Sequence, residues 1–184
     1  MSPNCILSVD LGIHNIGYAI YTISDDKLQF GLYDIDSNLT ASDRKANVVV
    51  TRTKYIYMFV SNVFKQYPID TVIIERQVNN NTMAMELMYS LTACVYNFCK
   101  DIVIFDPKLK FTSLGLTYNT KNKAHKKLSI NIVKNYITKY YPDLLSSFED
   151  NSKQDDISDA VLMIFTHINK NNVEALMKIK SVIE

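Results

Sequence analysis

The sequence predicts an α/β fold built on a mixed sheet of five strands. Three short apolar runs come first, separated by brief turn signals, and two more follow, each preceded by a long helical segment. Strands joined by tight turns pair antiparallel, whereas strands separated by a helix pair in parallel. The length of 184 residues and the 47% share of hydrophobic residues suit one well-filled core. We therefore expect a single domain over residues 1–184, with helices flanking the sheet.

The five expected strands are apolar or alternating runs bounded by turn residues. The letters "SDDK" at 24–27 mark the turn between the second and third strands. The fourth run, "DTVIIE", ends in an acid, and the fifth, "DIVIFDP", is stopped by Pro107, which cannot continue a ladder. The runs cover residues 4–10, 16–23, 28–35, 70–75 and 101–107.

The expected helices show apolar residues at a spacing of three to four. This spacing runs from Val48 to Phe64 without Gly or Pro. The segment 82–99 is apolar almost all round, so it is either deeply buried or holds one face against a partner. Replacing Met88 or Tyr89 with arginine and measuring the mass in solution would distinguish the two. Later helices are expected at 123–140, from near Lys153, and at 172–182.

Composition excludes several classes of protein. No stretch reaches the eighteen or so apolar residues of a membrane helix, and the start "MSPNCILSVD" lacks the pattern of a secretory signal, so we expect a cytosolic or nuclear protein. Cys5, Cys94 and Cys99 stand in apolar surroundings, which favours reduced, packed thiols. The net charge of +1 shows no basic excess, yet the segment from Pro107 to Tyr140 carries eight lysines and no acid.

Four acids stand where a metal site would need them. Asp10 and Glu75 close two buried strands, at the end of the sheet where α/β folds bind ligands. Asp156 and Asp159 are three residues apart and share one side of a helix, although acids in a first turn also serve as caps. Converging carboxylates repel one another, and divalent cations relieve that repulsion. The pattern indicates a nuclease site with two metal ions.

Four motifs in order resemble the RuvC-type Holliday junction resolvases, especially those of poxviruses. They are "SVDLGIHNIGYAI", "VIIERQ", "AHKKLSINIV" and "KQDDISDAVLMIF". The resemblance implies an RNase H-like fold and a homodimer that nicks four-way DNA junctions symmetrically, leaving a 5′-phosphate. It also implies Mg²⁺ as cofactor, two ions per site with Mn²⁺ as a substitute, and, for a poxvirus-type protein, action in the cytoplasmic viral factory. The catalytic residues it implies are Asp10, Glu75, Lys126 (with Lys127 as the alternative), Asp156 and Asp159, all but the lysine as metal ligands.

The lysine-rich segment is the expected contact surface for branched DNA. Poxvirus-type resolvases often place arginines after their "ERQ" motif, whereas the "VNNN" that follows "ERQ" here is uncharged, so phosphate contacts should concentrate among the lysines. His14 in the first turn is either a further phosphate contact or an ordinary turn residue. The lysines expected to bind DNA are Lys108, Lys110, Lys121, Lys123 and Lys127.

Other functions remain as alternatives or are excluded. An RNase H acting on RNA–DNA hybrids would use the same fold and similar acids, and a non-catalytic junction-binding protein would use the acids only as caps. ATPases of related fold need several glycine-rich phosphate loops, and this chain has four glycines in all. No GxGxxG motif follows any strand, which excludes a nucleotide-binding dehydrogenase.

Overall fold

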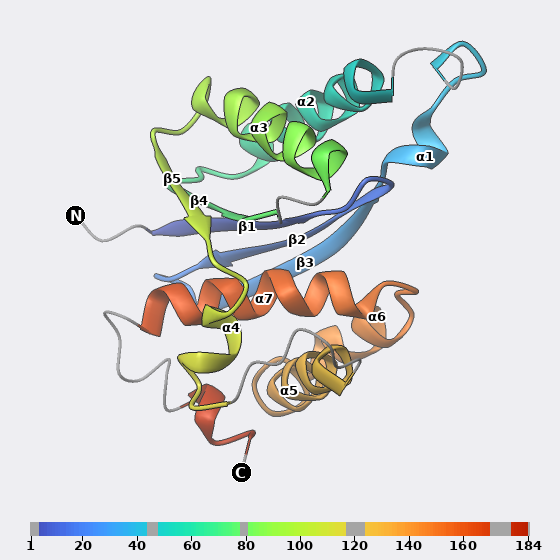
Figure 1. The fold of residues 1–184 in the computed structure, drawn as a ribbon. Coiled ribbons are helices and arrows are strands. Elements are labelled where there is room, and N and C mark those ends of the chain that lie inside the picture. Colours follow the sequence, from blue (N-terminus) through green and yellow to red (C-terminus); the bar gives the residue numbers. More distant parts are fainter. Residues whose placement is uncertain (1–3, 44–47, 78–80, 117–123, 170–177, 184) are drawn as a thin grey trace.

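The computed structural model describes residues 4–43, 48–77, 81–116, 124–169 and 178–183. A central sheet carries helices on both faces, with α2 and α3 on one side and α4 to α7 on the other (Figure 1). Among the described residues, no helix is long and apolar enough to cross a membrane. Cys5, Cys94 and Cys99 are free and buried, as expected for packed thiols.

The sheet confirms the predicted strand arrangement. Its spatial order is β3-β2-β1-β4-β5, with β1 antiparallel to β2, β2 antiparallel to β3, and β4 parallel to both β1 and β5. Each strand begins and ends within two residues of its predicted bounds. The strands are β1 (Cys5–Leu11), β2 (Asn15–Thr22), β3 (Lys27–Asp34), β4 (Thr71–Glu75) and β5 (Asp101–Phe105).

The long helices were also predicted, but the short ones were not. The four-residue helices α1 and α4 are too short to show a helical period, so no pattern in the sequence predicts them. The helix predicted at 172–182 lies mostly outside the described residues. The helices are α1 (Ile35–Asn38), α2 (Val48–Gln66), α3 (Thr82–Tyr96), α4 (Leu109–Thr112), α5 (Ala124–Tyr140), α6 (Leu145–Glu149) and α7 (Gln154–Asn169), with the 3₁₀ helix η2 (Pro142–Leu144).

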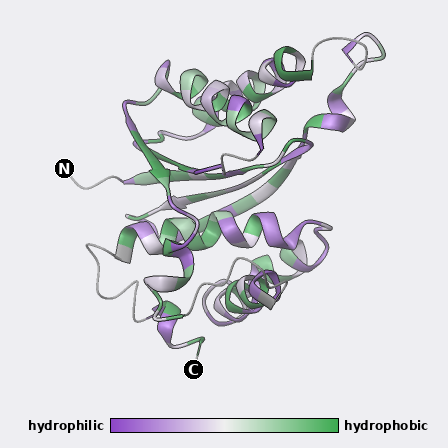
Figure 2. Cartoon of the chain, in the orientation of Figure 1, coloured by the Kyte–Doolittle hydropathy of each residue, from purple (hydrophilic) through white to green (hydrophobic). Residues whose placement is uncertain are grey.

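Two hydrophobic cores lie on opposite faces of the sheet. One joins alternate residues of β1, β2 and β4 to α2 and α3, and the other joins sheet residues that point to the opposite face to α5 and α7. Hydrophobic residues accordingly concentrate in the strands and along the helix faces turned toward them (Figure 2). In α3, Leu87 and Leu91 are buried whereas Tyr89 and Tyr96 are exposed, so this helix is not buried all round.

The alternation of side chains along the strands places the two strand-end acids on one face. Ile6 belongs to the core beside α7, and Val9 to the core beside α2 and α3. Because side chains alternate, Asp10 shares the face of Ile6. Ile73 likewise belongs to the α7 side, so Glu75, two residues later, faces α7 as well.

Candidate metal centre and active site

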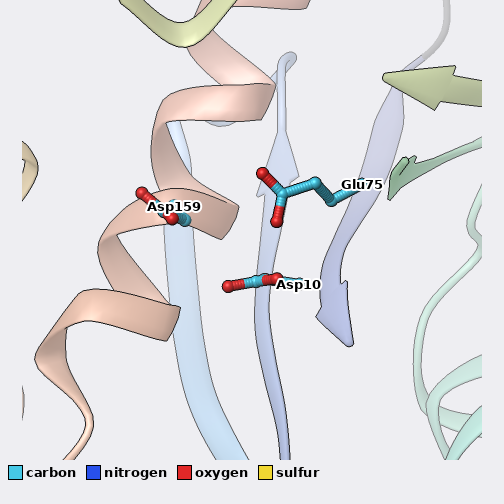
Figure 3. A group of neighbouring side chains, drawn as sticks. All are labelled: Asp10, Glu75 and Asp159. Atoms are coloured by element: carbon cyan, nitrogen blue, oxygen red, sulfur yellow. The ribbon is translucent and has the colours of Figure 1, made fainter. Parts of the chain in front are cut away.

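Three carboxylates meet between the sheet and α7. Asp10 comes from β1, Glu75 from the last position of β4, and Asp159 from the second turn of α7. Each offers an oxygen, and these oxygens lie within 4.8 Å of one another. Figure 3 shows the three side chains converging on a common space from separate elements. We call these three residues the acid triad.

The register of the parallel strands brings two members of the acid triad together. Val9 pairs with Ile74 across the β1–β4 ladder, so the next residues, Asp10 and Glu75, leave the sheet side by side. Parallel strands lie about 4.8 Å apart, which sets the separation of these neighbours. Helix α7 packs across β1 and β2 and brings Asp159 to these two acids.

The electrostatics of the acid triad oppose full ionisation. Burial raises the pKa of Asp10 well above its usual range, and the neighbouring charge of Glu75 raises it further. Burial also raises the pKa of Asp159, while the ammonium of Lys110 pulls it back down. Cations beside the acid triad would therefore favour its full ionisation at neutral pH.

Lys110 supplies one of these cations, and its position corrects a sequence-based expectation. We expected Lys110 on an exposed DNA-binding surface, but its side chain is only 3% exposed and lies inside the site. Its Nζ donates to Glu75 Oε1 at 2.6 Å and lies 2.8 Å from Asp159 Oδ2. Burial alone would lower the pKa of Lys110, but the carboxylates of Glu75, Asp159 and Asp10 outweigh burial and raise it.

The position of Lys110 follows from topology. Strand β5 is parallel to β4, so the chain after Phe105 leaves the sheet at the same edge as Glu75. The short helix α4 then turns Lys110 and Phe111 inward, and both are buried. The signal available in the sequence was the placement of this lysine just after a parallel strand, rather than its membership of a lysine-rich segment.

Asp156 lies beside the acid triad but is not one of the carboxylates that meet within 4.8 Å. Its Oδ2 accepts a hydrogen bond of 2.5 Å from Asn15 Nδ2. Burial raises the pKa of Asp156, and the bond from Asn15 opposes that rise. At Gly17, an added Cβ would lie 2.7 Å from the backbone carbonyl of Asp156, so only glycine lets α7 pack this closely on β2. Sequence reasoning missed Asn15, whose partner is distant in the chain.

Lys126, the lysine expected to assist catalysis, reaches the same end of α7. Its Nζ lies 2.5 Å from Asp155 Oδ2, and its side chain is 70% exposed. Lys127, the alternative, is exposed, as is Lys108. Lys121 and Lys123, both expected to bind DNA, lie outside the described residues.

His14 is tied to a small polar cluster at the turn after β1. Its Nδ1 lies 2.6 Å from Asp36 Oδ2, and Arg52 Nη2 donates to the other oxygen of Asp36 at 2.8 Å. Arg52 also donates through Nε to the carbonyl of Ile13 at 2.6 Å. The buried arginine thus holds the turn between Asp10 and Asn15 in place.

The acid triad fits a divalent cation. Its three carboxylates and the one ammonium of Lys110 sum to −3 + 1 = −2 when all are ionised. The donor set consists of carboxylate oxygens, without histidine or cysteine, which is the chemistry that hard divalent ions prefer.

Comparison with known proteins gives matches along nearly the whole chain. The model of the family described as "Poxvirus A22 protein" matches residues 4–171. The enzyme named crossover junction endodeoxyribonuclease RuvC from Alkaliphilus metalliredigens (strain QYMF) is 26% identical over 183 residues, covering 95% of this chain and 99% of the relative. Its namesake from Clostridioides difficile (strain 630) is 25% identical over 179 residues, covering 94% and 95%.

Solved structures share the fold. The fowlpox virus resolvase in complex with Holliday junction DNA has a TM-score of 0.60 at 20% identity, covering 90% of this chain and 97% of the other. The yeast mitochondrial Holliday junction resolvase Ydc2 has a TM-score of 0.61 at 14% identity, covering 97% and 81%. Thermus thermophilus RuvC with its junction substrate has a TM-score of 0.55 at 12% identity, covering 89% and 92%. These likenesses confirm the predicted RNase H-like fold.

Proposed function

We propose, from the premise that this chain belongs to the Poxvirus A22 protein family, that it is an endonuclease that resolves four-way DNA junctions by paired symmetric nicks. The observation that carries this proposal is the acid triad of Asp10, Glu75 and Asp159, assembled from three elements within 4.8 Å. Caps and turns do not need such a cluster, because they satisfy backbone groups locally. We further propose that residues 1–184 form one nuclease domain acting in the cytoplasm, at the viral factory, as the poxvirus family suggests.

The proposed cofactor is Mg²⁺, two ions per site, with Mn²⁺ as a working substitute. Asp10, Glu75 and Asp159 would hold the ions, and Asp156 would complete the ligand set from the same helix. When bound, such ions acidify a water and neutralise charge on the phosphate and the leaving oxygen. The support for this choice is the all-carboxylate donor set and its formal charge of −2 with Lys110 included.

The lysines of the site have separate tasks in the proposed reaction. Lys110 is buried between two carboxylates, so it orients Glu75 and Asp159 and offsets their charge. Lys126 is exposed and adjacent, so it is the group placed to donate a hydrogen bond to a phosphate oxygen and stabilise the charge that develops there. The bond to Asp155 raises the pKa of Lys126, which favours a charged hydrogen-bond donor over a general base.

The proposed DNA surface extends from these residues over four further lysines of the same segment. Lys108 precedes α4 and Lys127 follows Lys126 on α5, and both are exposed. The proposed surface also includes Lys121 and Lys123, because they lie between Lys108 and Lys127 in the sequence. Contacts of this kind position the backbone without reading its sequence, which suits recognition of branched structure.

The outward face of α3 supports a homodimer. Tyr89 and Tyr96 are 59% and 61% exposed and lie seven residues apart, on one side of the helix, with the exposed Ala93 between them. A two-fold dimer would present two active sites to the two symmetric strands of a junction. Tyr89→Arg should leave a folded protein with monomer mass in light scattering, and a persistent dimer would refute α3 as the interface. Met88 is unsuitable for this test because it is 5% exposed and belongs to the core.

The experiment that tests the function is nicking of a labelled four-way junction beside a linear duplex and an RNA–DNA hybrid. Wild type and Glu75→Gln are compared with Mg²⁺ and with chelator. Paired symmetric nicks in the junction, dependent on metal and lost in Glu75→Gln, are the expected result. Preferred cutting of the hybrid would instead establish an RNase H activity, and tight junction binding without cutting would establish a binding protein.

A further inference from the structure

Asp155 contacts Lys126, the exposed lysine that the proposed mechanism places at the phosphate. Its Oδ2 lies 2.5 Å from Lys126 Nζ, and the two side chains are 22% and 70% exposed. Burial alone would raise the pKa of Asp155, but the hydrogen bond and the charge of Lys126, with smaller contributions from Lys153 and a backbone hydrogen bond, together lower it. The pair is therefore a charge-assisted bond between a carboxylate and an ammonium.

The helical spacing of α7 sets where this bond lies. Asp155 and Asp159 are four residues apart, so their side chains share one face of the helix with Cβ atoms about 5–6 Å apart. Asp159 belongs to the acid triad. The bond to Asp155 thus holds the ammonium of Lys126 about one helical turn from the acid triad.

We propose that Asp155 is a positioning residue for Lys126, fixing its ammonium where it meets the scissile phosphodiester. This inference rests on the proposed function, in which Lys126 donates to a phosphate oxygen. A lysine that is 70% exposed has little packing to restrict its four side-chain torsions, so the carboxylate is what limits its position. Exposed ion pairs contribute little to stability, which makes a purely structural purpose a weak explanation.

The chain offers a matched control for this pair. Lys134, two turns further along α5, lies 2.5 Å from Glu149 of α6, with exposures of 47% and 45%. This pair joins the same helix to an acid by the same chemistry, but neither partner neighbours a member of the acid triad in sequence. Glu149→Gln therefore changes the net charge by the same amount as Asp155→Asn and breaks an equivalent bond.

The test is a double-mutant cycle of Asp155→Ala and Lys126→Ala, read by single-turnover junction cleavage with saturating enzyme and Mg²⁺. Asp155→Ala should cut about 10- to 100-fold more slowly, as expected when a reacting group loses its alignment. Junction affinity is measured in variants that also carry Glu75→Gln, so that the DNA is bound but not cut. Adding Asp155→Ala to Glu75→Gln should not raise the dissociation constant for the junction. The double variant should be no slower than Lys126→Ala, and Asp155→Glu should recover most of the rate. Glu149→Gln should cut at the wild-type rate.

Several results would overturn the proposal. One is a wild-type cleavage rate in both Asp155→Ala and the isosteric Asp155→Asn. Another is a double variant whose rate loss equals the product of the two single losses. A third is a loss of rate in Glu149→Gln as large as that in Asp155→Asn. Thermal melting of each variant shows whether a slow rate reflects unfolding, and Asp155→Asn replaces Asp155→Ala if the latter does not fold. An absence of junction cutting by wild type would overturn the function and this inference together, whereas a failed cycle in an enzyme that cuts and needs Glu75 would overturn this inference alone.

Discussion

Replacing Lys110 with methionine would leave the acid triad without the ammonium that contacts Glu75 at 2.6 Å and Asp159 at 2.8 Å. Methionine keeps an unbranched apolar stem, so the change removes mainly the charge. Breaking a buried ion pair from one side costs about 3–5 kcal/mol, because the remaining charge stays buried without its partner. The oxygens of the acid triad lie within 4.8 Å of one another, and two ionised carboxylates at that limit would repel by about 3.5 kcal/mol at an effective dielectric of 20, which is the same range.

Thermal unfolding in chelator measures this loss. For a chain of this length each kcal/mol moves the midpoint by about 2–4 °C, so Lys110→Met should melt about 6–20 °C below wild type. Mg²⁺ should then raise the midpoint of Lys110→Met more than that of wild type, because the acid triad of the variant has a larger uncompensated charge.

The matched control is Lys134→Met, which breaks the exposed pair with Glu149. Such pairs contribute about 0–1 kcal/mol, so the midpoint should fall by no more than about 4 °C. The reasoning is refuted if Lys110→Met in chelator melts as Lys134→Met does. It is also refuted if Mg²⁺ shifts Lys110→Met and wild type equally.

Three further predictions concern the same end of the sheet. The pKa of Asp10 is raised in the folded state, so its ionisation costs stability at neutral pH, and that cost disappears as pH falls toward the unfolded value of about 3.9. Asp10→Asn should therefore raise the midpoint in chelator at pH 7 but not at pH 4, while junction cutting is lost. Gly17→Ala should cost about 1–3 kcal/mol in urea unfolding and slow cutting, because its Cβ meets the backbone of Asp156 at 2.7 Å. Arg52→Met should cost about 1–3 kcal/mol by the same measurement, because the carbonyl of Ile13 and the carboxylate of Asp36 lose a buried donor.

The parts of the site that the sequence predicted are those set by local periodicity. Asp10 and Glu75 end apolar runs, and a two-residue alternation is enough to show that each belongs to one face of a strand. The pairing of Asp156 with Asn15 and the burial of Lys110 depend instead on how α7 and α4 settle against the sheet. Lys110 was misassigned because a lysine in a run of lysines is usually solvated, and a four-residue helix leaves no pattern to indicate otherwise.

Helix phase explains why the acids of α7 could be found but not sorted. Asp155, Asp156 and Asp159 all fall on one broad side of the helix, so spacing alone cannot say which one reaches the sheet. The close approach at Gly17 fixes the rotation of α7 over β2, and the three acids then diverge. Asp159 joins the triad, Asp156 meets Asn15, and Asp155 meets Lys126.

The repulsion within the acid triad is built into the β-ladder itself. Val9 and Ile74 are partners in the parallel register, so the residues that follow them, Asp10 and Glu75, leave the sheet as neighbours whatever α7 does. A shift of one residue in either strand would send its acid to the opposite core, among the apolar residues packed under α2 and α3. The register that buries both cores is thus the same register that forces two carboxylates together. The fold cannot relax this repulsion without losing its apolar packing, so full ionisation of both carboxylates requires cations, from Lys110 in the chain and from divalent ions in the proposed reaction.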